Sequence, residues 1–259
     1  MNFRRFAVLS SVMLFAFYAL LFLSLFQYFD AGLFVEHLLS ERVRHALKLS
    51  VITASISSGI AVLLGLPAAY AISRYRFAGK NIIDTMLELP MIVSPAALGA
   101  MILIFFSSPV GQKIQQSGFD VVFTWKGIVV AQFTTVAGMA TRLLKAVMDE
   151  VPTRYEMVAR SLGAKPAVAF FTVTLPLMRR GIIASLILTW AKALGEFGAT
   201  FTVAGAMAMK TETLSTAIFM RLSTANIEAA VTLILIVVGV GFTTLYVTRL
   251  ITAGREKDA

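Results

Sequence analysis

The sequence has no cysteine and only two histidines, which together exclude several kinds of site. Without cysteine there is no disulfide, no thiolate metal site and no cysteine nucleophile. His37 and His45 fall in one predicted loop and are too few for a histidine metal cluster. Charged residues are also scarce, at 14% of the chain against about 25% in a soluble domain. We therefore predict no metal site, no catalytic residue and no soluble domain.

Hydrophobic residues are abundant instead, at 58% of the 259 residues. This predicts an all-α, multi-pass membrane protein. Six transmembrane helices are predicted, at about residues 6–29, 47–73, 86–107, 127–148, 181–205 and 229–248. The first run, with Arg4 and Arg5 before it, could also be a signal peptide. It is too long for one, and no small-x-small cleavage site follows Gln27.

Proline and the connecting segments complete this pattern. Pro67, Pro90 and Pro95 fall inside predicted spans, where we expect them to kink or end the helix. Residues 30–46 and 206–227 are expected to be polar connections. We divide the chain into a first helix with its loop (1–42), a core (43–250) containing a polar loop at 152–176, and a tail (251–259).

The formal net charge of +9 could suggest a nucleic-acid partner, but the basic residues lie between the spans. With six spans both termini share one side, and that side holds fifteen basic residues against seven on the other. The positive-inside rule makes the richer side cytoplasmic. The fifteen are Arg4, Arg5, Arg74, Arg76, Lys80, Arg142, Lys145, Arg154, Arg160, Lys165, Arg179, Arg180, Arg249, Arg255 and Lys257. Both termini and the 152–176 loop are then cytoplasmic, and no nucleic-acid partner is expected.

The 152–176 loop predicts two short helices joined by a glycine elbow. Thr153 and Glu156 have the spacing of a capping box at the start of the first helix. An apolar stripe follows along that helix, made of Tyr155, Val158, Ala159 and Leu162. Gly163 suits a left-handed residue at the helix end, and Pro166 suits the first turn of the next helix. Leu175-Pro176 is expected to end that second helix. An ordinary interfacial loop would show the same spacing.

The fifth span carries two ionisable residues, Lys192 and Glu196, roughly 17 and 22 Å above Gly181 along a helix. Ionisable groups at this depth are costly and face a bundle interior or a water-filled path. Four residues apart, the two share a helix face and could pair, which is the interpretation we favour; they could also line a substrate pathway. A proton relay is disfavoured because no second mid-membrane carboxylate is apparent. Gly195, Gly198 and Ala199 are expected to allow close helix packing.

Hydroxyl side chains recur inside the predicted spans, among them Ser57, Ser94 and Thr135. Hydrogen bonding to carbonyls of their own helix is the simpler interpretation. A polar seam along an anion pathway is the alternative.

Glu156, Ala159 and Gly163, followed by Leu175-Pro176, resemble the "EAA" loop of permease subunits of ATP-binding-cassette (ABC) importers. The usual two alanines after the glutamate are Met157-Val158 here. The resemblance implies a cytoplasmic coupling helix that docks on an ATPase subunit. Its predicted coupling residues are Arg154, Glu156, Ala159, Arg160, Leu162, Gly163 and Ala164.

Residues 191–200, with 203–205 and 210–218, are similar to the permeases for molybdate, which often also carry tungstate. The related sulfate permeases typically have tyrosine where Phe197 stands, and Lys192 replaces a usual arginine. The resemblance covers about residues 43–250. It implies the type I ABC importer fold in a bacterial or archaeal plasma membrane, and a homodimer with the pathway between the copies. It also implies two cytoplasmic ATPase subunits, which hold the ATP and Mg²⁺, and an extracytoplasmic oxyanion-binding protein.

Two other classes of function lack support in the residues. An ion-coupled secondary transporter would need inverted repeats or a second buried carboxylate. A membrane-embedded enzyme would need a nucleophile with its base, or metal ligands, inside the spans. The prediction is therefore a non-catalytic permease for a tetrahedral oxyanion, with sulfate as the alternative to molybdate or tungstate.

Overall fold

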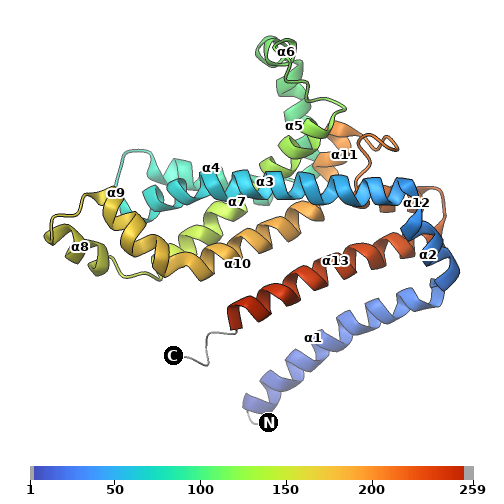
Figure 1. Cartoon of the computed structure of the whole chain (residues 1–259), viewed down its shortest axis with the longest axis horizontal. Coiled ribbons are helices and arrows are strands. Elements are labelled where there is room, and N and C mark those ends of the chain that lie inside the picture. Colours follow the sequence, from blue (N-terminus) through green and yellow to red (C-terminus); the bar gives the residue numbers. More distant parts are fainter. Residues whose placement is uncertain (1–2, 254–259) are drawn as a thin grey trace.

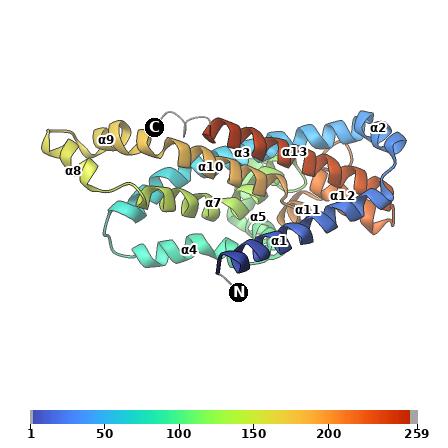
Figure 2. The ribbon, with the colours of Figure 1, turned by 90° about the horizontal axis from the view of Figure 1, so that it is seen from below.

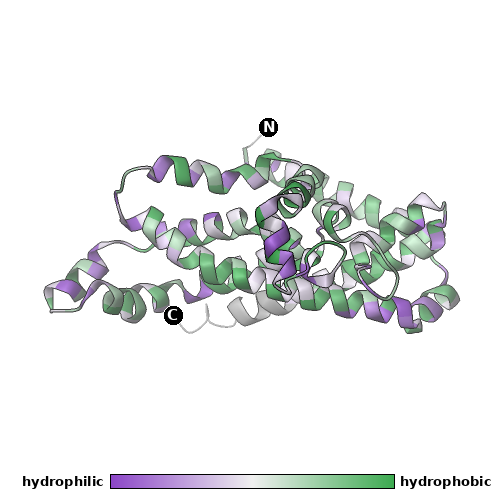
Figure 3. Cartoon of the chain, turned by 90° about the horizontal axis from the view of Figure 1, so that it is seen from above, coloured by the Kyte–Doolittle hydropathy of each residue, from purple (hydrophilic) through white to green (hydrophobic). Residues whose placement is uncertain are grey.

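The computed structural model describes the backbone of residues 3–253 and the side chains of residues 3–246, and every regular element in this part is helical. Most of the predicted 251–259 tail lies outside it. Long helices run along one axis, with α8 and α9 at one end and α2 and α12 at the other (Figure 1). Hydrophobic residues follow the long helices, and hydrophilic patches gather at their ends (Figure 3). This distribution fits a membrane protein.

Five helical runs are long and apolar enough to cross a membrane, and each covers most of one predicted span, although the fourth run ends at Leu194, short of the predicted end at residue 205. They are α1 (Phe3–Leu25) with its extension η1 (Phe26–Tyr28), α3 (Glu41–Arg74), α7 (Trp125–Asp149), the continuous run of α9 (Pro166–Ala169), η2 (Phe170–Thr174) and α10 (Leu175–Leu194), and α13 (Ile227–Ala253). Pro67 lies inside α3 without ending it. These runs confirm the membrane-protein class.

The predicted third span is broken into two half-helices, α4 (Lys80–Ile92) and α5 (Pro95–Ser107), bent by 114°. Ser94 has extended backbone dihedrals, and its side chain accepts a hydrogen bond from the Ala97 amide as the N-cap of α5. Pro95 then occupies the first turn, where its missing N–H costs nothing. Pro95 therefore breaks the span as predicted, whereas Pro90 lies inside α4. The segment 86–107 is therefore not one continuous helix, and the break lies at one of the two prolines expected to kink or end it.

The segments predicted as polar connections contain capped helices. Residues 30–46 hold α2 (Ala31–Leu39), capped by Asp30, and the first turns of α3, capped by Ser40. Residues 206–227 hold α12 (Leu214–Ser223), whose capping box joins Thr213 and Thr216. A further short helix, α6 (Pro109–Gln116), follows α5 and projects with it from the bundle (Figure 1).

The centre of the bundle is the contact between α3 and α7, which places small side chains against each other. Ala54 and Ala61 of α3 and Ala140 of α7 are buried in one cluster. A Cβ on Gly65 of α3 would lie 3.1 Å from the Thr141 hydroxyl of α7. Small residues let two membrane helices approach closely, which strengthens dispersion contacts that lipid cannot replace.

Candidate functional site

The 152–176 loop forms the predicted helix, elbow and second helix. The first helix, α8, spans Arg154–Ser161, and Gly163 after it has φ +94°. The Gly163 amide donates to the Arg160 carbonyl at 3.0 Å and the Ala164 amide to the Ala159 carbonyl at 3.1 Å. This pair of bonds is the Schellman ending that Gly163 predicted. Pro166 opens α9, also as predicted.

The second helix does not end at Leu175-Pro176, so that prediction was wrong. The π-helical segment η2 interrupts the run, and its wider turn lets the Leu175 amide reach the Phe170 carbonyl five residues back. Pro176 then falls in the first turn of α10, a position that tolerates its missing donor. Residues 166–194 therefore continue without a break from the loop into the fifth span.

The capping box between Thr153 and Glu156 does not form. Thr153 has helical dihedrals, and its side chain makes no capping hydrogen bond. Glu156 is instead the one buried residue of α8 and faces the protein. Its carboxylate accepts hydrogen bonds from the Tyr70 hydroxyl at 3.0 Å, Arg74 Nε at 3.1 Å and the Thr174 hydroxyl at 2.6 Å. Hydrogen bonds to donors from distant segments therefore replace the local capping bond of Glu156. The spacing of Thr153 and Glu156 alone could not have revealed these donors.

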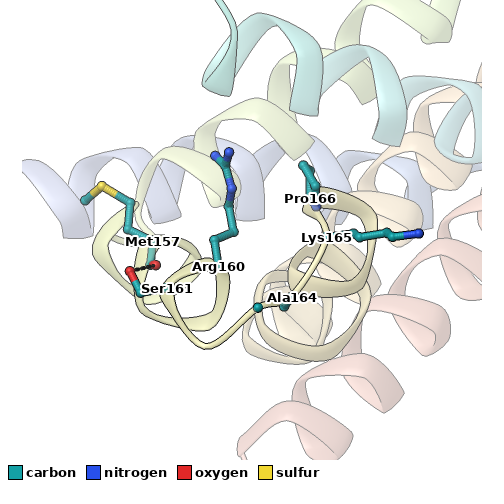
Figure 4. A pocket seen from close by; sticks show the side chains of 7 residues that line it. Met157, Arg160, Ser161, Ala164, Lys165 and Pro166 are labelled. Carbon is teal, nitrogen blue, oxygen red and sulfur yellow. Dashed lines mark hydrogen bonds between the residues drawn. The ribbon is translucent and has the colours of Figure 1, made fainter.

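The other face of α8 is open and apolar. The exposed fractions of Val158 and Leu162 are 61% and 85%, and Tyr155 is 43% exposed. Beside this stripe the elbow forms a hollow of about 530 Å³ lined by Met157, Arg160, Ser161, Gly163, Ala164, Lys165 and Pro166. Figure 4 shows the Arg160 and Lys165 side chains extending away from the elbow. Arg154 is also exposed, so the loop presents an apolar stripe flanked by positive charge.

Lys192 and Glu196 do not share a helix face, contrary to the sequence prediction. Helix α10 ends at Leu194, and α11 (Gly198–Ala204) begins after a break that contains Glu196. Glu196 is 2% exposed, and its Oε1 accepts a hydrogen bond from the Ala199 amide at 3.1 Å. Lys192 is exposed and forms no ion pair or hydrogen bond within the described residues. At the break, the Glu196 carboxylate satisfies an amide in the first turn of the new helix.

The small residues near this break behave differently from one another. A Cβ on Gly198 would lie 3.0 Å from Pro95 of α5, and Ala199 is fully buried, so both allow α5 and α11 to pack closely. Gly195 has only its own helix carbonyls nearby, so the predicted packing role does not apply to it.

The three candidate hydroxyls have structural partners. Ser57 donates to the carbonyl of Thr53 at 2.8 Å and also lies 3.1 Å from the Val129 carbonyl of α7. Thr135 donates to the Gln132 carbonyl at 2.8 Å, and Ser94 caps α5. Thr135 therefore bonds a carbonyl of its own helix, as the simpler interpretation predicted, and Ser57 does so as well while also contacting α7.

Residues 61–256 match the family model described as "Binding-protein-dependent transport system inner membrane component". The chain belongs to this family. It is a permease subunit of an ABC importer, a non-catalytic component of the inner membrane. Of its relatives, the sulfate transport system permease protein CysT of Salmonella typhimurium is 35% identical over 71% of this chain and 68% of its own. The molybdenum transport system permease protein ModB of Mycobacterium tuberculosis is 33% identical, covering 74% of each chain.

Two solved structures show the same fold for the permease. A bacterial alginate ABC transporter in complex with its periplasmic protein gives a TM-score of 0.73 at 18% identity, covering 97% of each chain. The inward-facing MetNI methionine ABC transporter gives 0.65 at 15% identity, covering 83% of this chain and 99% of that one. These likenesses confirm the predicted type I importer fold.

The permease holds one ion pair that the sequence pattern missed at the α2/α12 end. Arg42 Nε and Nη2 each lie 2.6 Å from a carboxylate oxygen of Glu212, whose side chain is 2% exposed. The bidentate geometry joins the start of α3 to the segment before α12. The two residues are 170 positions apart, so no local signal pairs them.

A second missed cluster joins α4 to α7. Arg142 Nη1 lies 2.6 Å from Glu88 Oε1 and 3.8 Å from Asp84 Oδ1, and all three side chains are partly exposed. Glu88 falls near the start of the predicted third span, so it is a carboxylate within a span, although not at its middle. Arg142 likewise lies within α7, although it was counted with the loop. Counting charges inside the predicted spans would have found both residues.

Proposed function

We propose that this permease carries a tetrahedral oxyanion, molybdate or tungstate, across the membrane by alternating access. In this proposal two ATPase subunits dock on α8 and the elbow, and an extracytoplasmic binding protein delivers the anion. The permease itself binds no cofactor. ATP-driven closure of the ATPases displaces α8, and the spans rock as rigid bodies.

The apolar stripe of α8 is the observation that carries the docking proposal. A helix outside the bundle that exposes 61% of Val158 and 85% of Leu162 needs a protein surface to cover these side chains. Arg154, Arg160 and Lys165 beside the stripe would favour an acidic rim on that partner. The second observation is the elbow hollow, which is open to an inserted side chain.

Cytoplasmic placement of this loop is supported by the arrangement of the helices. Helix α1 runs toward the α2/α12 end and α13 runs back from it, so the start of α1 and the end of α13 both lie away from the α2/α12 end (Figures 1 and 2). The Arg74–Lys80 connection lies at the α8/α9 end, so most of the fifteen basic residues gather there. The positive-inside rule then makes it the cytoplasmic end.

The oxyanion class is supported by the relatives, which include both molybdenum and sulfate permeases at similar identity. Phe197, directly after Glu196, is the residue that favours molybdate or tungstate, because the sulfate permeases typically have tyrosine there. Sulfate is the second candidate, favoured by the 35% identity to a sulfate permease.

Homodimerisation is part of the proposal and is supported by the Arg142, Glu88 and Asp84 cluster. These side chains are 45%, 35% and 28% exposed on helices within or near the membrane. Charges that reach the hydrocarbon are costly against lipid, so in this proposal a second copy or a water-filled path covers them. A pathway between two copies would do both.

Uptake in cells tests the proposal, with reporter fusions as a check on its geometry. We expect ATP-dependent uptake of labelled molybdate. Unlabelled tungstate should inhibit this uptake more strongly than unlabelled sulfate does. A reporter after Ala164 should be cytoplasmic and one after Lys210 extracytoplasmic. Stronger inhibition by sulfate would favour sulfate as the substrate. The opposite reporter pattern would place α8 on the side of the membrane away from the ATPase and would refute the docking site.

A further inference from the structure

Three segments of the chain meet at the buried carboxylate of Glu156. Besides α8 itself, Tyr70 and Arg74 come from the end of α3, and Thr174 from the end of η2. The Arg74 and Glu156 side chains are only 8% and 10% exposed. A carboxylate turned inward in this way offers little to a docked partner, although it lies on the helix that presents the apolar stripe.

Arg74 extends the same cluster to the end of α7. Its Nη2 donates to the carbonyls of Met148 at 3.0 Å and Val151 at 2.7 Å. The Met148 carbonyl lies in the last turn of α7 and the Val151 carbonyl follows that helix, so Arg74 adds a side-chain donor where the helix ends. One guanidinium therefore holds α3, the end of α7 and, through Glu156, α8.

The connections around α8 explain why such an anchor is needed. Residues 150–153 between α7 and α8 are not helical, and residues 162–165 after α8 form the elbow. A helix tethered only by two such connections would swing when pushed, because loop residues absorb changes in backbone angle. The Glu156 contacts oppose this swing directly.

We propose that Tyr70, Arg74 and Thr174 are positioning residues that, through Glu156, lock α8 to the adjoining ends of α3 and α7. These four residues form the α8 anchor. With the anchor intact, α8 and the helix ends move as one body, so a displacement of α8 reaches the spans undiminished. With the anchor broken, α8 still docks but its motion is lost in the connections. The inference rests on the proposed function, because it needs an ATPase that moves α8.

The test compares variants that remove one contact with a matched control in the reconstituted permease, ATPase and binding-protein complex. Thr174→Val removes the hydroxyl that bonds Glu156, Thr174→Ser keeps it, and Thr172→Val removes a neighbouring hydroxyl that bonds only its own helix, at the Val168 carbonyl. Glu156→Gln removes the charge at the centre. The readout is labelled molybdate taken up per ATP hydrolysed, with co-purification of the ATPase as the assembly check.

We expect uptake per ATP to fall about tenfold for Glu156→Gln and about threefold for Thr174→Val, as charge-assisted bonds are lost. Thr174→Ser and Thr172→Val should keep the wild-type ratio, and all variants should still co-purify with the ATPase. Wild-type uptake per ATP in assembled Glu156→Gln and Thr174→Val complexes would overturn the inference. The inference would also be overturned if these variants lowered only the abundance of the protein, because the anchor would then contribute to folding alone. Failure of the wild-type permease to bind any ATPase would instead refute the proposed function.

Discussion

Gly138 of α7 and Leu87 of α4 touch backbone to backbone, since a Cβ on Gly138 would lie 1.9 Å from the Leu87 carbonyl oxygen. One helical turn further along α7, Arg142 pairs with Glu88 of α4. Helix α4 stands at the edge of the bundle (Figure 2), so these neighbouring contacts are a main part of what holds it to α7.

Replacing Gly138 with alanine should therefore displace α4. We expect Gly138→Ala to destabilise the protein by about 1–3 kcal/mol, the range for overpacking at a tight contact. Gly59→Ala is the matched control, because a Cβ on Gly59 of α3 meets nothing within 4 Å. Thermal unfolding in detergent measures both. Equal melting temperatures for the two variants would contradict the contact.

The elbow requires glycine at position 163 because the backbone φ there is +94°. A Cβ added at this position would meet no atom within 4 Å, so the requirement comes from the backbone angle and not from crowding. Gly163→Val should strain the backbone by about 1–3 kcal/mol and deform the elbow while leaving the spans intact. We expect normal abundance in the membrane but reduced ATPase co-purification and uptake. Gly163→Asn is the milder control, since asparagine tolerates positive φ better. A Gly163→Val protein with normal abundance and normal uptake would refute this role.

Lys192 and Glu196 should behave independently, because the helix break separates them. Glu196→Ala should lower stability by about 1–2 kcal/mol, since it leaves the buried Ala199 amide without its acceptor. Lys192→Met should leave stability unchanged and, if Lys192 lines the anion pathway, lower molybdate uptake. A double-mutant cycle on thermal stability measures the coupling. A coupling well above about 0.5 kcal/mol would restore the pairing that we first expected.

The bidentate contact of Arg42 with Glu212 should stabilise the α2/α12 end of the protein. Arg42→Ala leaves a buried carboxylate without its charged partner, and we expect a loss of about 2 kcal/mol. Arg42→Lys should recover only part of this, because an ammonium group cannot form the fork. Arg44→Ala, at an exposed neighbouring position, is the control for a lost charge. A melting temperature for Arg42→Ala equal to that of Arg44→Ala would show that the pair contributes nothing.

Much of the fold could be predicted because its signals are local. Apolar runs marked the spans, Gly163 and Pro166 marked the elbow, and the charge asymmetry suggested the orientation. Even the break at Ser94-Pro95 has a local signature, an N-cap residue followed by proline. Hydropathy by itself merges the two half-helices into one run, so the prolines were the only sequence signal of the break.

The rest depends on contacts between distant parts of the chain. Glu156 looked like a capping residue, but donors from Tyr70, Arg74 and Thr174 hold it inside the protein. The end of α10 at Leu194 could not be read from composition either, since residues 189–200 contain no proline. Tertiary partners overrode the local preference at Glu156, whereas the break after Leu194 is accompanied by a local hydrogen bond from the Ala199 amide to Glu196.

The central claim is that the exposed face of α8 docks on an ATPase in the cytoplasm, and a single cysteine at Leu162 tests it most directly. The chain has no native cysteine, so Leu162→Cys carries the only thiol. Leu162 is 85% exposed, which makes the site reactive without disturbing the core. We predict that a short thiol-reactive photocrosslinker attached there links the permease to an ATPase subunit in membranes. Absence of that crosslink, together with labelling by a membrane-impermeant reagent from the extracytoplasmic side, would contradict the account.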